Sequence, residues 1–202
     1  MNIHRRKLLL VPLAVSSLAG CDWLRGRPAG PSFQSTDITG AEFARVLDLP
    51  GLDGRRRTLA DWKGKVTVVF FGYTQCPDFC PATLAEMAQI RRTLGSDGDR
   101  LQVVFITVDP ERDTPEILAA YTANFGPGVT ALRGTPEETA AVAKEFKVFY
   151  SKVPGKTPGS YTMDHSAASF VFDASGRVRL YVPYGSEPKS VAADVKQLLA
   201  SG

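Results

Sequence analysis

Two cysteines, Cys76 and Cys80, stand four residues apart between an apolar run and a helix-like pattern. Thiols at this separation can coordinate a soft metal ion, exchange electrons as a dithiol and disulfide, or do both. Pro81 suits the first position of a helix, which would place Cys80 at or beside the N-cap. The unpaired amides and the helix dipole would favour a thiolate there and so lower the cysteine pKa.

The residues of the pair leave several kinds of chemistry open. A structural disulfide closing so short a loop would contribute little to stability through chain entropy. Thioredoxin-like oxidoreductases use Cys-x-x-Cys, whereas three residues separate these cysteines and leave room for an ion. Thiolates select Cu(I), an added imidazole allows Cu(II), and a structural zinc site would need more ligands. A peroxidase would need a threonine and arginine setting, of which only Thr74 is evident.

The N-terminus is typical of an export signal, with a basic region at 5–7, an apolar stretch at 8–18 and a small-residue site ending at Cys21. The apolar stretch is shorter than the roughly 20 residues that cross a bilayer. It resembles a bacterial lipoprotein signal, which implies removal of residues 1–20 and a lipid on Cys21. An ordinary cleaved signal or an uncleaved anchor is the alternative, and the Sec and twin-arginine routes both stay open.

Processing at that site would change the charge and the inventory of metal ligands. Asp22 resembles an inner-membrane retention signal, so we expect the protein on the periplasmic face of the bacterial inner membrane. The precursor carries 24 basic and 21 acidic side chains, and loss of the basic signal region leaves a neutral chain. A neutral chain without a long basic run lacks the positive surface that binds nucleic acid, so we expect no nucleic-acid partner. His4 is lost too, which leaves His165 as the single histidine.

The rest of the chain predicts a flexible tether and one α/β domain. Residues 21–40 are rich in Gly, Pro, Ser and Thr, as linkers are, and residues 41–202 suffice for one domain. Runs of β-branched and aromatic residues predict strands, and Thr-Pro caps and helical periodicity predict helices between them. The expected strands are 66–71, 102–108, 169–172 and 178–182, and helices are expected to begin near 81, 115, 136 and 188. With a hairpin or short strands near 46–59, this order predicts a thioredoxin-like fold: a mixed sheet flanked by helices, with an N-terminal β-hairpin extension.

His165 lies in the segment 161–166, which we take as a loop just before the strand at 169. In a thioredoxin-like fold this loop faces the N-terminus of the first helix, where the cysteines are. A lone histidine is more often a surface or core residue than a ligand, but this position favours a ligand. Met163 could offer a thioether, although packing is the simpler interpretation.

The segment 108–115 follows the second long strand, at a strand end of the kind that often carries sites in α/β folds. Its simpler interpretation is a turn and a helix cap whose charged residues, Glu111, Arg112 and Asp113, pair locally. The functional alternative places Asp109 near the cysteine loop, as a partner of the site.

These segments together closely resemble the Sco/SenC family of copper-binding proteins, from about residue 38 to 199. The resemblance rests on Gly64-Lys65, Phe71 to Thr74, the Cys-Pro-Asp-Phe-Cys-Pro run from Cys76 to Pro81, residues 108–115 and Asp164-His165-Ser166. It implies a thioredoxin-like fold and copper, Cu(I) or Cu(II), bound by Cys76, Cys80 and His165. Asp109 and Asp164 are the candidates for supporting residues.

The family implies a membrane-tethered copper chaperone that assists assembly of the dinuclear copper centre of cytochrome c oxidase subunit II. The alternative is a thiol-disulfide reductase that keeps the cysteines of that subunit reduced. The expected partners are subunit II, a second periplasmic copper donor or a thioredoxin-like reductant, and the membrane through the lipid. Whether metal or electrons are delivered stays open, as does whether the protein is an enzyme.

Overall fold

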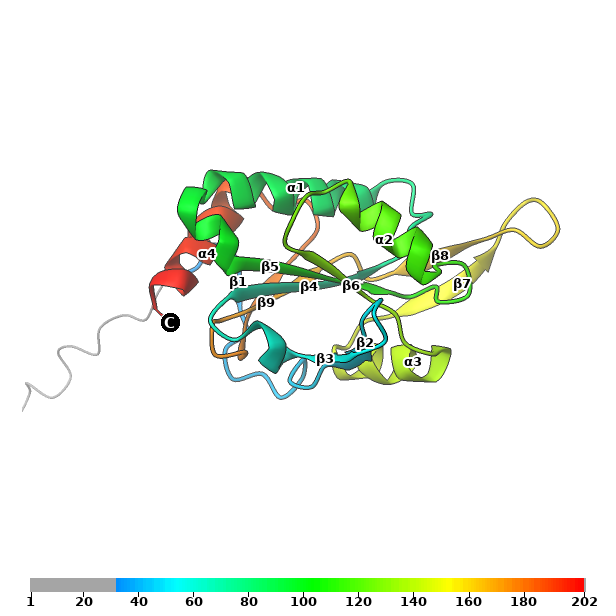
Figure 1. Ribbon diagram of the computed structural model, residues 1–202, viewed down its shortest axis with the longest axis horizontal. Helices are drawn as coiled ribbons and strands as arrows, with labels where there is room; N and C mark the ends of the chain where they lie inside the picture. The colour runs from blue at the N-terminus through cyan, green and yellow to red at the C-terminus, as the bar shows by residue number, and fades with distance from the viewer. Residues whose placement is uncertain (1–31, 202) are drawn as a thin grey trace, which may run out of the picture. The chain divides into compact units, whose positions relative to one another are not determined.

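A six-stranded mixed sheet forms the centre of the protein, in the strand order β1-β10-β9-β4-β5-β6 (Figure 1). The computed structural model describes residues 32–201, so the predicted signal segment and Cys21 lie outside it. The strands are β1 (Thr36–Asp37), β4 (Val66–Gly72), β5 (Leu101–Thr107), β6 (Val129–Leu132), β9 (Ser169–Phe172) and β10 (Val178–Val182). β4 pairs in parallel with β5 and antiparallel with β9, so the sheet is mixed, as predicted.

The parallel strands β4 and β5 are buried along their whole lengths because elements cover both faces of the sheet. Near-continuous apolar sequences are typical of strands in that position. Helices α1 (Phe79–Thr93) and α4 (Pro188–Ala200) contact each other on one face, and α3 (Pro136–Glu145) lies on the other (Figure 1). Helix α2 (Pro115–Ala123) packs against β6.

The register of β4 and β5 places their carboxyl ends side by side. Gly72 pairs with Thr107, and the Val108 amide donates to the Gly72 carbonyl at 2.8 Å. The loop after β4 contains Cys76, and the loop after β5 contains residues 108–114. The two loops that the sequence singles out are therefore neighbours.

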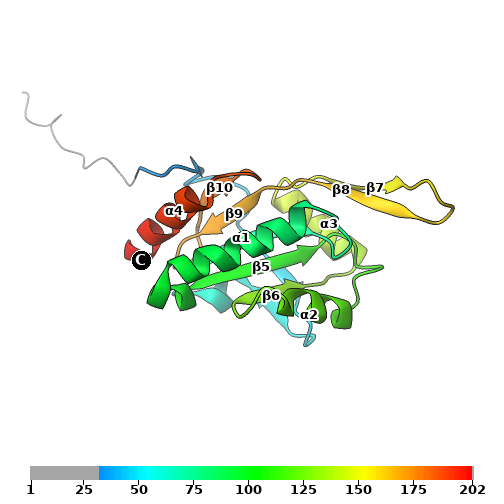
Figure 2. The same cartoon turned by 90° about the horizontal axis from the view of Figure 1, so that it is seen from above.

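Two antiparallel hairpins lie outside the main sheet. β2 (Asp48–Pro50) and β3 (Arg56–Thr58) form the N-terminal hairpin predicted near 46–59. β7 (Tyr150–Pro154) and β8 (Tyr161–His165) form a ribbon that projects from one end of the domain (Figures 1 and 2). The prediction of a loop at 161–166 is therefore wrong, since His165 ends a strand. β7 is mostly exposed and contains a proline, so it lacks the apolar alternation from which strands are recognised.

The helix starts follow the capping residues of the sequence, with one difference. Thr114 and Thr135 cap α2 and α3 as predicted, each accepting a hydrogen bond from an amide in the first turn. Helix α1 instead begins at Phe79 with Asp78 as its N-cap, two residues before the predicted start. Pro81 is tolerated as the third residue because its amide would lack an intrahelical partner anyway. Cys80 thus lies inside the first turn.

The sequence predicts a tether that ends at residue 40, but the chain already contacts the domain at Gln34 and Ser35. The buried carboxylate of Asp194, on α4, accepts hydrogen bonds from the amides of Gln34 and Ser35 at 2.9 and 2.8 Å. β1 then pairs with the edge strand β10. Within residues 32–201, no helix has both the length and the apolar character that crossing a membrane requires.

We predict that Gly72→Ala lowers the free energy of unfolding by about 1–3 kcal/mol, the usual cost of overpacking a core. A methyl group there would lie 2.5 Å from the Cys80 sulfur and 2.7 Å from the Phe105 ring. Urea unfolding measures the loss, and Gly40→Ala is the control, because a methyl there meets nothing within 4 Å and adds only backbone strain. Equal losses in the two variants would contradict the packing argument.

Candidate metal centre

The structure brings Cys76, Cys80 and His165 together from three separate elements. Their ligand atoms all lie within 4.8 Å of one another, and both cysteines are free thiols. Cys76 comes from the loop after β4, Cys80 from the first turn of α1 and His165 from the end of β8. Two soft sulfur donors and one imidazole therefore converge on one point.

The two cysteines differ in their surroundings. Cys76 follows a turn in which its amide donates to the Tyr73 carbonyl at 3.2 Å, and it lines the mouth of a cavity. Cys80 is almost completely buried, with its sulfur against Gly72. Both cysteines are therefore buried, and of the two Cys76 lines the cavity.

The electrostatics of the pair make Cys76 the first thiol to ionise. A hydrogen bond from Cys80 is the largest cause, and with backbone amides it lowers the pKa of Cys76 to about 4 despite burial. The same contact and its own burial raise the pKa of Cys80 above the ordinary thiol value. The reduced site therefore holds one thiolate and one thiol at neutral pH.

His165 presents a free nitrogen to the sulfurs. Its Nδ1 lies 3.1 Å from the carbonyl oxygen of Ser166, which can only accept a hydrogen bond. In the neutral ring Nδ1 must therefore carry the proton, which leaves the Nε2 lone pair directed at the Cys80 sulfur, 3.6 Å away. The edge of Tyr73 packs against the imidazole, with the ring centroids 5.9 Å apart.

The donor set fits a soft first-row metal ion. Bonds of about 2.0–2.3 Å from a metal to nitrogen and sulfur hold opposing donors about 4.0–4.6 Å apart, close to the 4.8 Å span found here. Two thiolates suit Cu(I), and the imidazole adds a ligand that Cu(II) also accepts. Only a small inward movement of the side chains would be needed for binding.

The mouth of the site is an open cavity of about 560 Å³ with an apolar rim. Phe79 and Phe149 on this rim are 43% and 65% exposed, so aromatic surface surrounds the approach to Cys76. Asp164, a candidate supporting residue, also lines the cavity, where its side chain is exposed. Its carboxylate therefore borders the entrance.

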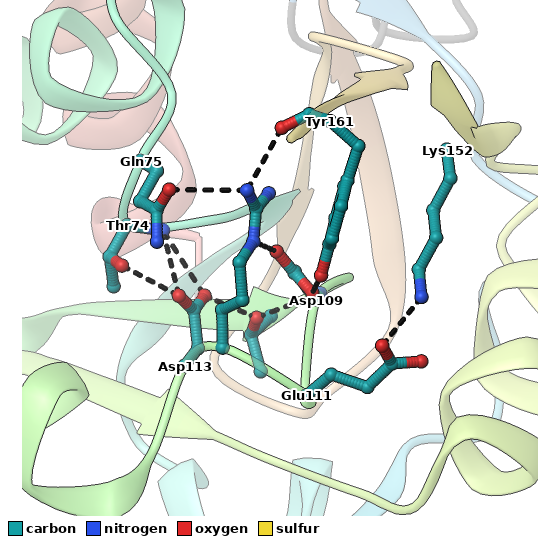
Figure 3. Close-up of polar contacts among 9 residues, drawn as sticks. Thr74, Gln75, Asp109, Glu111, Asp113, Lys152 and Tyr161 are labelled. Carbon is teal, nitrogen blue, oxygen red and sulfur yellow. Dashed lines mark hydrogen bonds and ion pairs between the residues drawn. The ribbon is translucent and has the colours of Figure 1, made fainter. Parts of the chain in front are cut away.

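Asp109, the other candidate, is buried and reaches the cysteine loop through a neighbouring arginine. One carboxylate oxygen accepts a hydrogen bond from the Tyr161 hydroxyl at 2.8 Å, and the other pairs with Nε of Arg112 (Figure 3). Nη1 of Arg112 in turn donates to Oε1 of Gln75, beside Cys76. Burial and the bond to Asp109 raise the pKa of Tyr161 to about 12, so its hydroxyl remains a donor at neutral pH.

The prediction that Glu111, Arg112 and Asp113 pair locally is wrong for Glu111 and Asp113, which contact distant segments, whereas Arg112 pairs with Asp109 of its own loop. Asp113 is fully buried and accepts hydrogen bonds from the Thr74 and Thr107 hydroxyls, each at 2.6 Å (Figure 3). Burial raises the pKa of Asp113, although these bonds oppose the rise. Glu111 pairs with Lys152 of β7 at 2.6 Å. Sequence reasoning missed Asp113, because nothing in its local pattern indicates burial.

The sequence is similar to proteins of one known family. A family model described as SCO1/SenC matches residues 34–200. The mitochondrial protein SCO2 homolog of Bos taurus is 32% identical over 204 residues, spanning 98% of this chain and 76% of that protein. The SCO2-like protein of Rickettsia felis is 36% identical over 135 residues, spanning 66% of each.

Solved structures with the same architecture include proteins with and without metal. The copper-bound structure of ScoI from Bradyrhizobium japonicum is 40% identical, with a TM-score of 0.69 over 78% of this chain and 99% of that one. The apo Sco1 protein of Thermus thermophilus is 35% identical, with a TM-score of 0.73 over 84% of this chain and 99% of that one. The predicted thioredoxin-like fold is confirmed.

We predict that the reduced protein keeps one thiolate down to about pH 4, whereas a free cysteine thiol ionises near pH 8.5. Thiolate absorbance in the ultraviolet, followed as the pH falls, should disappear near pH 4 and should be absent from Cys76→Ser at neutral pH. Cys80→Ala should move the transition upward, because it removes the hydrogen bond that contributes most. An unmoved transition in Cys80→Ala would exclude that bond as the cause.

Proposed function

Because this chain belongs to the SCO1/SenC family, we propose that it binds one copper ion through Cys76, Cys80 and His165 and delivers it to an acceptor protein. The observation that carries the proposal is the meeting of a thiolate, a thiol and an unprotonated imidazole nitrogen within 4.8 Å. The copper-bound ScoI structure, 40% identical to this chain, supports the choice of metal.

The site is suited to a cargo that must be released as well as held. Three protein ligands leave copper accessible to a donor atom of an acceptor that enters through the cavity beside Cys76. Oxidation of the pair offers a second release route. When Cys76 and Cys80 form a disulfide, two electrons pass to a partner disulfide, which becomes a dithiol by taking up two protons, those that the pair does not carry coming from solvent. The metal then loses both sulfur ligands.

The proposed acceptor is cytochrome c oxidase subunit II, whose dinuclear copper centre the family is expected to help assemble. A second periplasmic copper donor or a thioredoxin-like reductant would load or reduce the protein. Lipid on Cys21 would hold the chain on the periplasmic face of the inner membrane, near this acceptor.

A thiol-disulfide reductase acting on that subunit is the second candidate. The asymmetry of the pair favours it, because a thiolate at the cavity mouth, Cys76, can attack a partner disulfide and a buried thiol, Cys80, can resolve the mixed disulfide. The two candidates use the same residues and differ in what leaves the site.

We predict that anaerobic titration of the reduced protein gives one bound copper ion per chain, and that His165→Ala weakens Cu(II) binding more than Cu(I) binding. Two thiolates alone can hold Cu(I), whereas Cu(II) depends on the imidazole. Absorption and electron paramagnetic resonance measure both states, and Thr162→Ala, exposed on the same strand, is the matched control. Unchanged Cu(II) affinity and spectrum in His165→Ala would refute the three-ligand site.

Mixing the loaded protein with metal-free subunit II then separates the two candidates. Transfer of one copper ion per chain supports the chaperone. Reduction of a subunit II disulfide without copper transfer, by metal-free protein, supports the reductase.

We predict that the full chain incorporates labelled palmitate in a bacterial host and fractionates with the inner membrane. Cys21→Ser should lose the label, because the lipid has no other thiol to attach to at the processing site, while Cys76→Ser should keep it. Label retained by Cys21→Ser would contradict the proposed anchor.

A further inference from the structure

His165 is carried by a hairpin that is not hydrogen-bonded into the main sheet. β7 and β8 form a sheet of their own, and most of β7 is exposed. The cysteines, in contrast, lie in the loop after β4 and in the first turn of α1, and both are part of the buried core. The distance between the imidazole and the sulfurs therefore depends on whatever holds the hairpin against the cysteine loop.

We infer that Arg112 is the positioning residue that joins these two parts of the site. This inference rests on the proposed function, since it concerns how the three copper ligands are held in place. Arg112 belongs to neither part: it lies in the loop between β5 and α2, beside the cysteine loop. From there its guanidinium group contacts both.

The contacts of the guanidinium run in three directions. Nη1 donates to Oε1 of Gln75, in the cysteine loop, at 3.1 Å. It also donates, at 2.9 Å, to the carbonyl of Tyr161, the first residue of β8. Nε pairs with buried Asp109 of its own loop. One planar group thus bridges Gln75, beside Cys76, and Tyr161, on the strand that ends at His165; Figure 3 shows both hydrogen bonds as dashed lines.

Aromatic packing fixes the plane of this bridge. The guanidinium carbon lies 3.6 Å from the centroid of the Tyr161 ring and 5.7 Å from that of Tyr73. The Tyr161 hydroxyl returns to Asp109, so the arginine, the tyrosine and the carboxylate form a closed set. Tyr73 also packs on His165, which extends the contact to the imidazole itself.

An arginine is needed for this arrangement. Its rigid fork can donate to two acceptors while its face stacks on a ring, whereas the ammonium group of a lysine is a point charge without a plane. Nη2 is buried and has no hydrogen-bond partner within residues 32–201. Buried polar groups are rarely left unsatisfied. The position of the Arg112 side chain is therefore explained by the contacts of Nη1, Nε and the guanidinium face, and not by Nη2.

A nearby arginine offers a matched control. Arg133 donates to the carbonyls of Asp113 and Pro110 at 2.9 and 2.8 Å, so it supports the same loop from another side, and within residues 32–201 it makes no hydrogen bond to the hairpin. Loss of Arg133 reports on the stability of the loop alone. Loss of Arg112 reports on the bridge as well.

The first test needs no metal. Hydrogen exchange of the β8 amides and the ring signals of His165 are compared in the reduced wild-type chain, Arg112→Met and Arg133→Met, with His165→Ala assigning the ring signals. In Arg112→Met we expect β8 amides to exchange about tenfold faster or more, as local opening becomes easier, and the His165 signals to leave the shifted position that the Tyr73 ring imposes. In Arg133→Met both should stay as in wild type.

The second test uses copper as the probe. Arg112→Met should weaken Cu(II) binding about 10–100-fold, as loss of a group that orients a ligand commonly does, and move its spectrum toward that of His165→Ala. Cu(I) binding should change less, and Arg112→Lys should give an intermediate result. If Arg112→Met does not fold, Arg112→Lys carries both tests, because it keeps the charge against Asp109 and loses the fork.

Unchanged β8 exchange and His165 signals in the Arg112 variants would overturn the inference, as would equal changes in Arg133→Met. Unchanged Cu(II) affinity and spectrum in Arg112→Met would overturn it too. Failure of the proposed function can be told apart from failure of this inference. If the wild-type protein binds no copper, the metal-free comparison of β8 exchange and His165 signals between wild type and Arg112→Met still decides whether Arg112 positions the hairpin.

Discussion

The site depends on the parallel pairing of β4 with β5, which ends with Gly72 opposite Thr107. That register brings the loop with Cys76 beside the loop with Asp109 and Asp113, and the missing side chain of Gly72 lets the Cys80 sulfur settle against the strand end. Carboxyl ends of neighbouring strands are where α/β folds build sites. Here the first loop supplies the Cys76 thiol, and the second supplies the buried carboxylates of Asp109 and Asp113.

The sequence predicts the parts of this arrangement that come from local pattern. Buried strands, Thr-Pro caps and the spacing of the two cysteines are all predicted from local sequence, and the position of His165 near the cysteines follows once the order of elements is known. The β7–β8 hairpin and the burial of Asp113 are not, since both arise from contacts between segments far apart in the chain. Asp194 is missed for the same reason, because its partners are backbone amides 160 and 159 residues away.

The two cysteines and His165 are therefore held in place in different ways. Cys76 and Cys80 are buried in the core, and the hydrogen bond between them lowers the pKa of Cys76 and raises that of Cys80. His165 ends a projecting ribbon whose connection to the core passes through hydrogen bonds and stacked side chains. The thiol half of the site is thus built by folding of the sheet, and the imidazole half is added by tertiary contacts that can be weakened separately.

The docking of Gln34 and Ser35 on Asp194 has a consequence for orientation. Helix α4, which carries Asp194, and the hairpin that carries His165 lie at opposite ends of the domain in both views (Figures 1 and 2). The chain therefore enters the domain at the end remote from the thiols.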